Sequence, residues 1–101
     1  MPRNSITLVG RASELAFDEF EFGTFIVNFT LTTLRGAQPQ LVVRCEGYGE
    51  QIAEQFELMD DGSLVGVIGT LTKGAVGALP LVRIERLEPL GQPEQLAEVA
   101  L

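Results

Sequence analysis

Hydrophobic and polar residues alternate over most of the chain, and a period of two is typical of β-strands with one buried face. The pattern is clearest where every second residue from Phe25 to Leu31 is a large hydrophobic one. Residues 15–22, in which aromatic residues are interleaved with carboxylates, are predicted to form an extended edge segment between the first two strands. The alternation as a whole predicts five strands, over residues 5–12, 24–34, 41–48, 63–73 and 79–87.

One segment departs from this period. Ile52, Phe56 and Met59 recur at the spacing of one helix face, which predicts a short amphipathic helix over residues 50–59, ended by an Asp-Asp-Gly sequence. The sequence therefore predicts an all-β fold, a five-stranded barrel with one short helix between the third and fourth strands. This is the element order of an OB-fold.

The length of 101 residues is that of a single domain. We place the domain at residues 1–90 and a C-terminal tail at residues 91–101. No run approaches the roughly 18 apolar residues of a membrane span, and the N-terminus lacks the apolar core of a signal peptide. The single cysteine, Cys45, excludes an intrachain disulfide and is typical of a reducing compartment. We therefore expect a soluble intracellular protein that does not associate with membranes.

The side chains that most catalytic sites require are scarce. The chain has no histidine, which removes the imidazole base and the commonest nitrogen ligand for a metal. Cys45 is predicted to point inward from the third strand and has no histidine to activate it, so it is a poor nucleophile. We predict that the protein is not an enzyme, binds no metal or other cofactor and has no small-molecule substrate.

Four short strings, in order along residues 4–88, carry a resemblance to a known family. Residues 4–11 read Asn-Ser-Ile-Thr-Leu-Val-Gly-Arg and residues 27–31 read Val-Asn-Phe-Thr-Leu. Tyr48 ends the third strand with an aromatic ring, and residues 62–71 read Gly-Ser-Leu-Val-Gly-Val-Ile-Gly-Thr-Leu. Each string resembles the corresponding strand of the bacterial-type single-stranded DNA-binding proteins (SSBs). The chain looks most like the short, tryptophan-poor SSB-like proteins of cyanobacteria and plastids.

This resemblance implies sequence-independent binding of single-stranded DNA in replication, repair or recombination. Such binding uses aromatic rings on which bases stack and cations along the path of the backbone. Tyr48 occupies a stacking position of the family, and Arg44 shares the outward face of its strand, with Glu46 between them. Other cations lie at the end of the first strand and at the roots of the two loops beside the OB-fold groove. The predicted DNA-binding residues are Arg44, Tyr48, Arg35, Lys73 and Arg11.

Several features depart from the family and predict weak binding. The chain has no tryptophan, and Val42 and Val76 stand where SSBs often have aromatic residues. The sequence has 7 Lys and Arg residues and 14 Asp and Glu residues, and the resulting net charge of −7 repels DNA at long range. The alternative prediction is an OB-fold protein-interaction module that has lost most nucleic-acid binding.

The resemblance also implies self-assembly and a location. SSBs associate through their first strands, so we expect a homodimer or homotetramer, in which several weak surfaces bind one DNA strand together. The location implied is the bacterial cytoplasm, with the nucleoid, or the plastid stroma. The predicted interface residues are Asn4, Ile6, Leu8 and Gly10.

Overall fold

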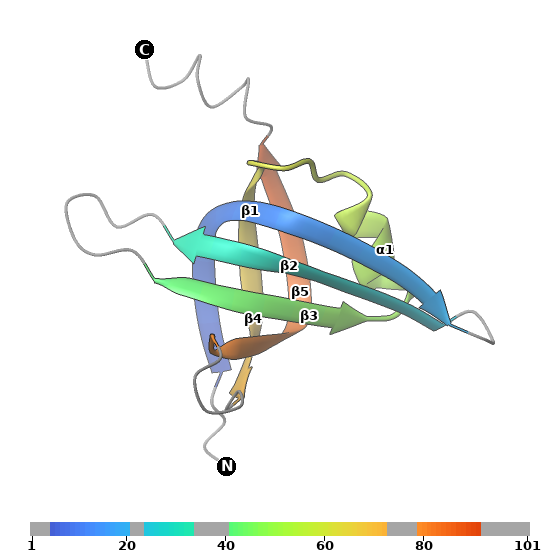
Figure 1. Cartoon of the computed structure of the whole chain (residues 1–101), viewed down its shortest axis with the longest axis horizontal. Coiled ribbons are helices and arrows are strands. Elements are labelled where there is room, and N and C mark those ends of the chain that lie inside the picture. Colours follow the sequence, from blue (N-terminus) through green and yellow to red (C-terminus); the bar gives the residue numbers. More distant parts are fainter. Residues whose placement is uncertain (1–4, 21–23, 34–40, 73–78, 92–101) are drawn as a thin grey trace.

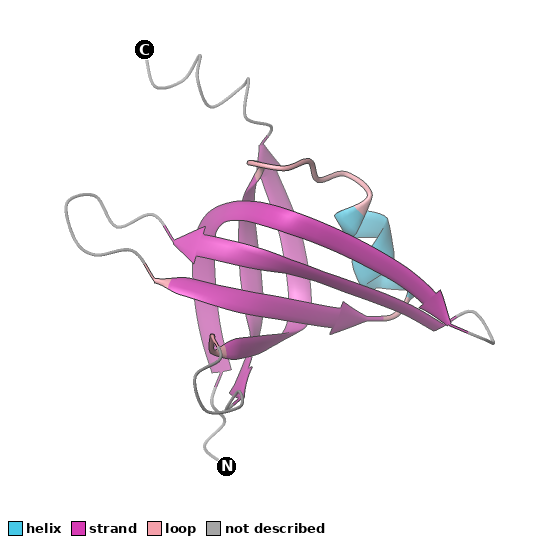
Figure 2. Cartoon of the chain, viewed as in Figure 1, coloured by secondary structure: helices cyan, strands magenta, loops and turns pink. Residues whose placement is uncertain are grey.

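The computed structural model describes residues 5–20, 24–33, 41–72 and 79–91, apart from the side chain of Phe20. These residues form a closed barrel in the order β1-β2-β3-β5-β4, with β1 also pairing with β4 (Figures 1 and 2). Neighbouring strands are antiparallel except β3 and β5, which are parallel. The predicted five-stranded barrel with a helix between the third and fourth strands is confirmed. The elements are β1 (Ser5–Phe20), β2 (Thr24–Thr33), β3 (Val42–Tyr48), α1 (Glu50–Phe56), β4 (Leu64–Thr72) and β5 (Leu81–Gly91).

Strand β1 is a single long, bent strand, as Figure 1 shows. Its first part pairs with β4 and its second part with β2. The pairing with β2 shifts register between Ser13 and Ala16, and Glu14 lies within the shift with a φ of 53°. A β-bulge of this kind bends a strand and increases its local twist. The strand therefore continues through the segment predicted to be separate, up to Phe20.

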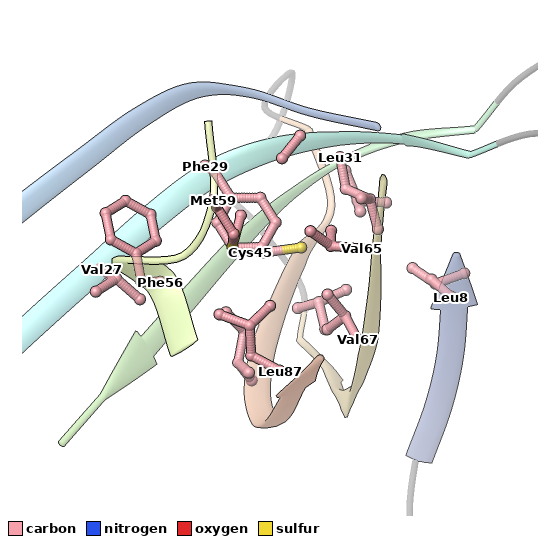
Figure 3. Packing of buried hydrophobic residues seen from close by; sticks show 14 of the residues in the cluster. Leu8, Val27, Phe29, Leu31, Cys45, Phe56, Met59, Val65, Val67 and Leu87 are labelled. Carbon is pink, nitrogen blue, oxygen red and sulfur yellow. The ribbon is translucent and has the colours of Figure 1, made fainter. Parts of the chain in front are cut away.

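The inward faces of β2 and β3 follow the predicted alternation. Val27, Phe29 and Leu31 are buried on β2, and Val43 and Cys45 on β3. Figure 3 shows side chains from several strands meeting in the centre of the barrel, where the Cys45 sulfur lies among hydrocarbon groups. This continuous core fixes which residues of the same strands face outward.

Helix α1 packs against β2, β3 and β5. It begins after Gly49, whose φ of 99° favours glycine, and it buries Ala53 and Phe56. The ring of Phe56 stacks on Phe29 in the core, with the centroids 6.4 Å apart. The helix ends at Phe56, earlier than predicted, but Met59 is buried in the turn that follows. The predicted apolar spacing thus identified the buried residues correctly and overestimated the helix length.

Two glycines allow close approach between strands. A Cβ atom at Gly10 would overlap the carbonyl of Thr32 on β2, and one at Gly69 would overlap the carbonyl of Arg83 on β5. Gly69 also adjoins a register shift between β4 and β5. At Gly66, by contrast, the nearest atom to such a Cβ is 3.7 Å away, an ordinary contact. Only Gly10 and Gly69, of these three positions, are required by the packing.

Strand β5 is longer than the predicted strand over residues 79–87, since it begins at Leu81 and continues to Gly91. Each end of β2, β3 and β4 lies within one residue of its predicted position. In the part of the chain that the structure describes, no helix has the length and apolar character needed to cross a bilayer.

Candidate functional site

The outward side chains of β2, β3 and β5 form one surface, which we call the outer face. Strand pairing sets its rows: Thr30 lies opposite Arg44, Asn28 opposite Glu46, and Ile26 opposite Tyr48. Strand β5 pairs with the other edge of β3, so Leu81 lies beside Arg44 and Arg83 lies beside Glu46. The outer face comprises Ile26, Asn28, Thr30, Thr32, Val42, Arg44, Glu46, Tyr48, Leu81 and Arg83.

Arg44 is held against β2. Its Nη1 atom donates a hydrogen bond of 2.6 Å to Oγ1 of Thr30, and its Nη2 atom donates one of 2.7 Å to Oδ1 of Asn28. The Thr30 hydroxyl in turn donates to a carboxylate oxygen of Glu14, at 3.4 Å. A guanidinium has five N–H donors, so these two bonds leave others to meet an anion above the face. Arg44 is therefore a fixed, half-buried cation in the middle of the outer face.

Tyr48 is the exposed aromatic residue of the outer face. Its side chain is 42% exposed, and its hydroxyl donates a hydrogen bond to the carboxylate of Glu46. That hydrogen bond raises the pKa of Tyr48, because removing the proton would leave two negative oxygens in contact. The guanidinium carbon of Arg83 lies 6.0 Å from the ring centroid, over the ring. Tyr48 is thus positioned by a carboxylate and a guanidinium together.

Arg83 was not among the residues predicted from the sequence. It lies on β5, where its register partner on β3 is Glu46. The alternation of residue types does predict that Arg83 points outward, since it lies between the buried residues Val82 and Ile84. Assigning it to this site also required the pairing of β3 with β5, which no local pattern reveals. The structure therefore adds one cation to the outer face.

The remaining predicted cations are not gathered around Tyr48. The exposed Arg11 donates a hydrogen bond of 3.2 Å from Nη1 to the carbonyl oxygen of Gly62, just before β4. Its register partner on β2 is Thr32, at the far end of the outer face from Tyr48. Arg35 and Lys73 lie outside the described residues.

The predicted assembly strand has an open edge. Residues 5–9 pair with β4 on one side, and pairing with β2 begins only at Gly10. Among the described residues, this stretch therefore has no strand along its other edge. Leu8 and Gly10 are buried and Ile6 is partly buried, so a partner strand would meet the backbone of these residues rather than their side chains. Asn4 lies outside the described residues.

A cleft of about 430 Å³ lies between α1 and β5, away from the outer face. Ile52 and Leu87 contribute its apolar part, and three carboxylates and one guanidinium its charged part. Its full lining is Gln51, Ile52, Glu54, Gln55, Glu85, Arg86, Leu87 and Glu88.

Acid–base or metal chemistry has little support in the described residues. Burial raises the pKa of the Cys45 thiol to about 12, so the reactive thiolate is suppressed at neutral pH. The described residues contain no group of three histidine, cysteine or acidic side chains placed to hold a metal ion.

The barrel is similar to several solved structures. One is SSBb, the second single-stranded DNA-binding protein of Mycobacterium smegmatis, with a TM-score of 0.77, 18% identity, and coverage of 87% of this chain and 89% of that chain. Another is the mitochondrial single-stranded DNA-binding protein of S. cerevisiae, with a TM-score of 0.72, 17% identity, and coverage of 91% and 99%. A third is PriB of Ralstonia solanacearum, with a TM-score of 0.68, 21% identity, and coverage of 87% and 98%.

These similarities confirm the predicted OB-fold, in the form that it takes in single-stranded DNA-binding proteins and PriB. No protein-family profile and no curated protein matches the sequence. At these identities the solved structures show the fold alone. A closer relationship to the SSB-like proteins of cyanobacteria and plastids stays a prediction.

Proposed function

We propose that this protein binds single-stranded DNA, weakly and largely independently of sequence, on the outer face of β2, β3 and β5. The observation that carries the proposal is the exposed ring of Tyr48 beside the Arg83 guanidinium, on a barrel similar to those of single-stranded DNA-binding proteins. An aromatic ring next to a cation provides both parts of sequence-tolerant binding, a surface for base stacking and a charge for the phosphate.

The charges of the protein explain why we expect its affinity for DNA to be low. Arg44 and Arg83 lie on the outer face and Arg11 at its end, and Arg35 and Lys73 are proposed to extend the path along the neighbouring loops. The net charge of −7 opposes every approach of DNA at long range. Neutralising two or three phosphates would give a slope of log affinity against log salt of only about −1.4 to −2.1. Binding of this kind needs low salt or several linked sites.

Assembly through β1 would provide the linked sites. The edge of residues 5–9 that no described strand covers offers its backbone groups to the same strand of a second copy. A dimer or tetramer built in this way would place several outer faces on one DNA strand, and avidity would raise the overall affinity. Sedimentation over a range of protein concentrations tests this part, and a monomer at every concentration would overturn it.

The decisive experiment is a titration of a labelled mixed-sequence oligonucleotide, at low and at physiological salt, followed by fluorescence anisotropy. The wild-type protein is expected to bind saturably at low salt and more weakly at the higher salt. Tyr48→Ala should weaken binding by about 5- to 150-fold, the contribution of one stacked base. The matched control Tyr48→Phe keeps the ring and should retain most of the affinity. No saturable binding at low salt, or unchanged binding by Tyr48→Ala, would refute the proposal.

A protein-interaction module is the second candidate function, and the cleft between α1 and β5 favours it. The cleft combines an apolar part with an excess of carboxylates, as a surface for a basic protein segment would. The segment over residues 50–61 adds further carboxylates and contains no Lys or Arg. The same titration separates the two candidates, because a module of this class would give no saturable DNA binding.

A further inference from the structure

Glu46 is an unexpected residue at the centre of a surface proposed to meet DNA. It lies on β3 between Arg44 and Tyr48, opposite Asn28 on one side and Arg83 on the other. A carboxylate there repels phosphate and lowers the affinity for any nucleic acid. A fully exposed acidic residue would turn away into solvent, but Glu46 is half-buried and its carboxylate accepts the hydrogen bond of the Tyr48 hydroxyl. Its position is fixed beside the ring.

The carboxylate has spare hydrogen-bonding capacity at that position. Its two oxygens together offer about four lone pairs, and the Tyr48 hydroxyl uses one of them. Asn28, its neighbour on β2, already accepts a hydrogen bond from Arg44 through its side-chain oxygen. The carboxylate of Glu46 is therefore an acceptor with free lone pairs at the hydroxyl end of the exposed ring.

A base stacked on Tyr48 would bring its polar edge to the rim of the ring, where this carboxylate lies. Cytosine presents an exocyclic amino group at that edge, which is a donor, whereas thymine and uracil present a carbonyl oxygen at the same place. The one N–H of the uracil edge lies between two carbonyl oxygens, and both repel a carboxylate. An amino base would thus gain a charge-assisted hydrogen bond that uracil lacks.

We propose that Glu46 makes the Tyr48 position selective for bases with an exocyclic amino group, such as cytosine, over uracil and thymine. This inference rests on the proposed function and refines it, since backbone contacts and stacking stay independent of sequence. The same carboxylate has two effects. It lowers the affinity for every DNA strand by repelling phosphate. For a strand whose amino-bearing base stacks on Tyr48, the added hydrogen bond offsets part of that loss.

The test compares labelled oligo(dC) with oligo(dU) of equal length, slightly above neutral pH, where cytosine is uncharged. These bases differ only in the groups of their pairing edge. The wild-type protein is expected to bind oligo(dC) about fivefold more tightly, the worth of one hydrogen bond. In Glu46→Gln both strands should bind more tightly and the ratio should approach one, because the amide pairs with either edge.

Glu88→Gln is the matched control, since Glu88 is an exposed carboxylate of β5 that lies opposite Gly66, outside the outer face. It removes the same charge and should leave the ratio at its wild-type value. Thermal unfolding of both variants confirms that each is folded. Equal affinities for the two strands in the wild type, or a ratio unchanged in Glu46→Gln, would overturn the role of Glu46 while the saturable binding itself still supports the proposed function. Absence of binding to either strand would refute both.

Discussion

Arg83 on β5 and Tyr48 on β3 meet across the parallel pair of strands, with the guanidinium carbon 6.0 Å from the ring centroid. The two residues are far apart in the sequence, and the closure of the barrel brings them together. The contact covers part of one ring face with a cation, while 42% of Tyr48 stays exposed. The pair therefore brings together the exposed ring and the cation on which the proposed DNA binding depends.

Loss of this cation should weaken DNA binding. Arg83→Ala is expected to reduce the affinity for a mixed-sequence strand about fivefold at low salt. It should also reduce the salt slope by about 0.7, the value for one phosphate contact on a single strand. Arg86→Ala is the control, because Arg86 is an equally charged residue of the same strand that lines the cleft beside α1. Equal effects of the two substitutions, measured by anisotropy titration, would assign the loss to net charge alone.

Arg44 is expected to contribute to stability as well as to binding. Its two hydrogen bonds satisfy Thr30, which is 6% exposed, and Asn28. Arg44→Met keeps the aliphatic stem and removes the donors, and should lower the free energy of unfolding by about 1–3 kcal/mol. Urea denaturation followed by circular dichroism gives this value. Arg86→Met serves as the reference for an exposed arginine, and a similar midpoint in both variants would show that the Arg44 bonds contribute nothing.

The glycines of β4 provide a matched pair. In Gly69→Ala the new methyl group would overlap the carbonyl of Arg83, so the strands must separate, and a loss of about 1–3 kcal/mol is expected. In Gly66→Ala the methyl group makes only an ordinary contact at 3.7 Å. This second change should be neutral or stabilising by about 0.5–1 kcal/mol, because alanine loses less backbone entropy in a strand. Thermal unfolding ranks the two, and the reverse order would contradict the packing described for Gly69.

Burial of Cys45 makes stability depend on alkaline pH. The pKa of its thiol rises from 9.0 to about 12, so the folded protein retains a proton that the unfolded chain releases. Its contribution to stability is complete below about pH 9 and is lost as the pH rises toward 12. The difference in unfolding free energy between the wild type and Cys45→Ala should therefore shrink over this range.

A thiol reagent should also label Cys45 far more slowly in buffer than in urea, and equal rates would show that the side chain is accessible.

The alternation of residue types was sufficient to predict the core. In β2 and β3 each inward residue is flanked by outward ones, so a period of two assigns Val27, Phe29 and Cys45 without any knowledge of the partner strands. The alternation did not predict the full length of β1, because the bulge at Glu14 shifts the register in the middle of the strand. A non-glycine residue with positive φ leaves no sequence signal of its own.

The candidate site was predictable only in part, for a related reason. Tyr48 was predicted because it stands at a stacking position of the family that the chain resembles, and Arg44 because the alternation places it on the same outward face. Arg83, and the hydrogen bonds that hold Arg44 to Thr30 and Asn28, depend on which strands are neighbours and on the direction of long side chains. Those relations are tertiary, and a single sequence contains no direct record of them.

The parallel pairing of β3 with β5 has a consequence for folding kinetics. Its ladder joins only Arg44 to Leu81, Cys45 to Val82 and Glu46 to Arg83, whereas the antiparallel pairs beside it are longer. Such a short, non-local ladder gives little enthalpy for the chain entropy lost in forming it, so it is expected to form late and to open first. Amide hydrogens at this seam should exchange with solvent earlier than those of β2. The contact between Tyr48 and Arg83 would then be among the last in the barrel to form, and DNA bound there, as proposed, would slow the separation of β3 from β5.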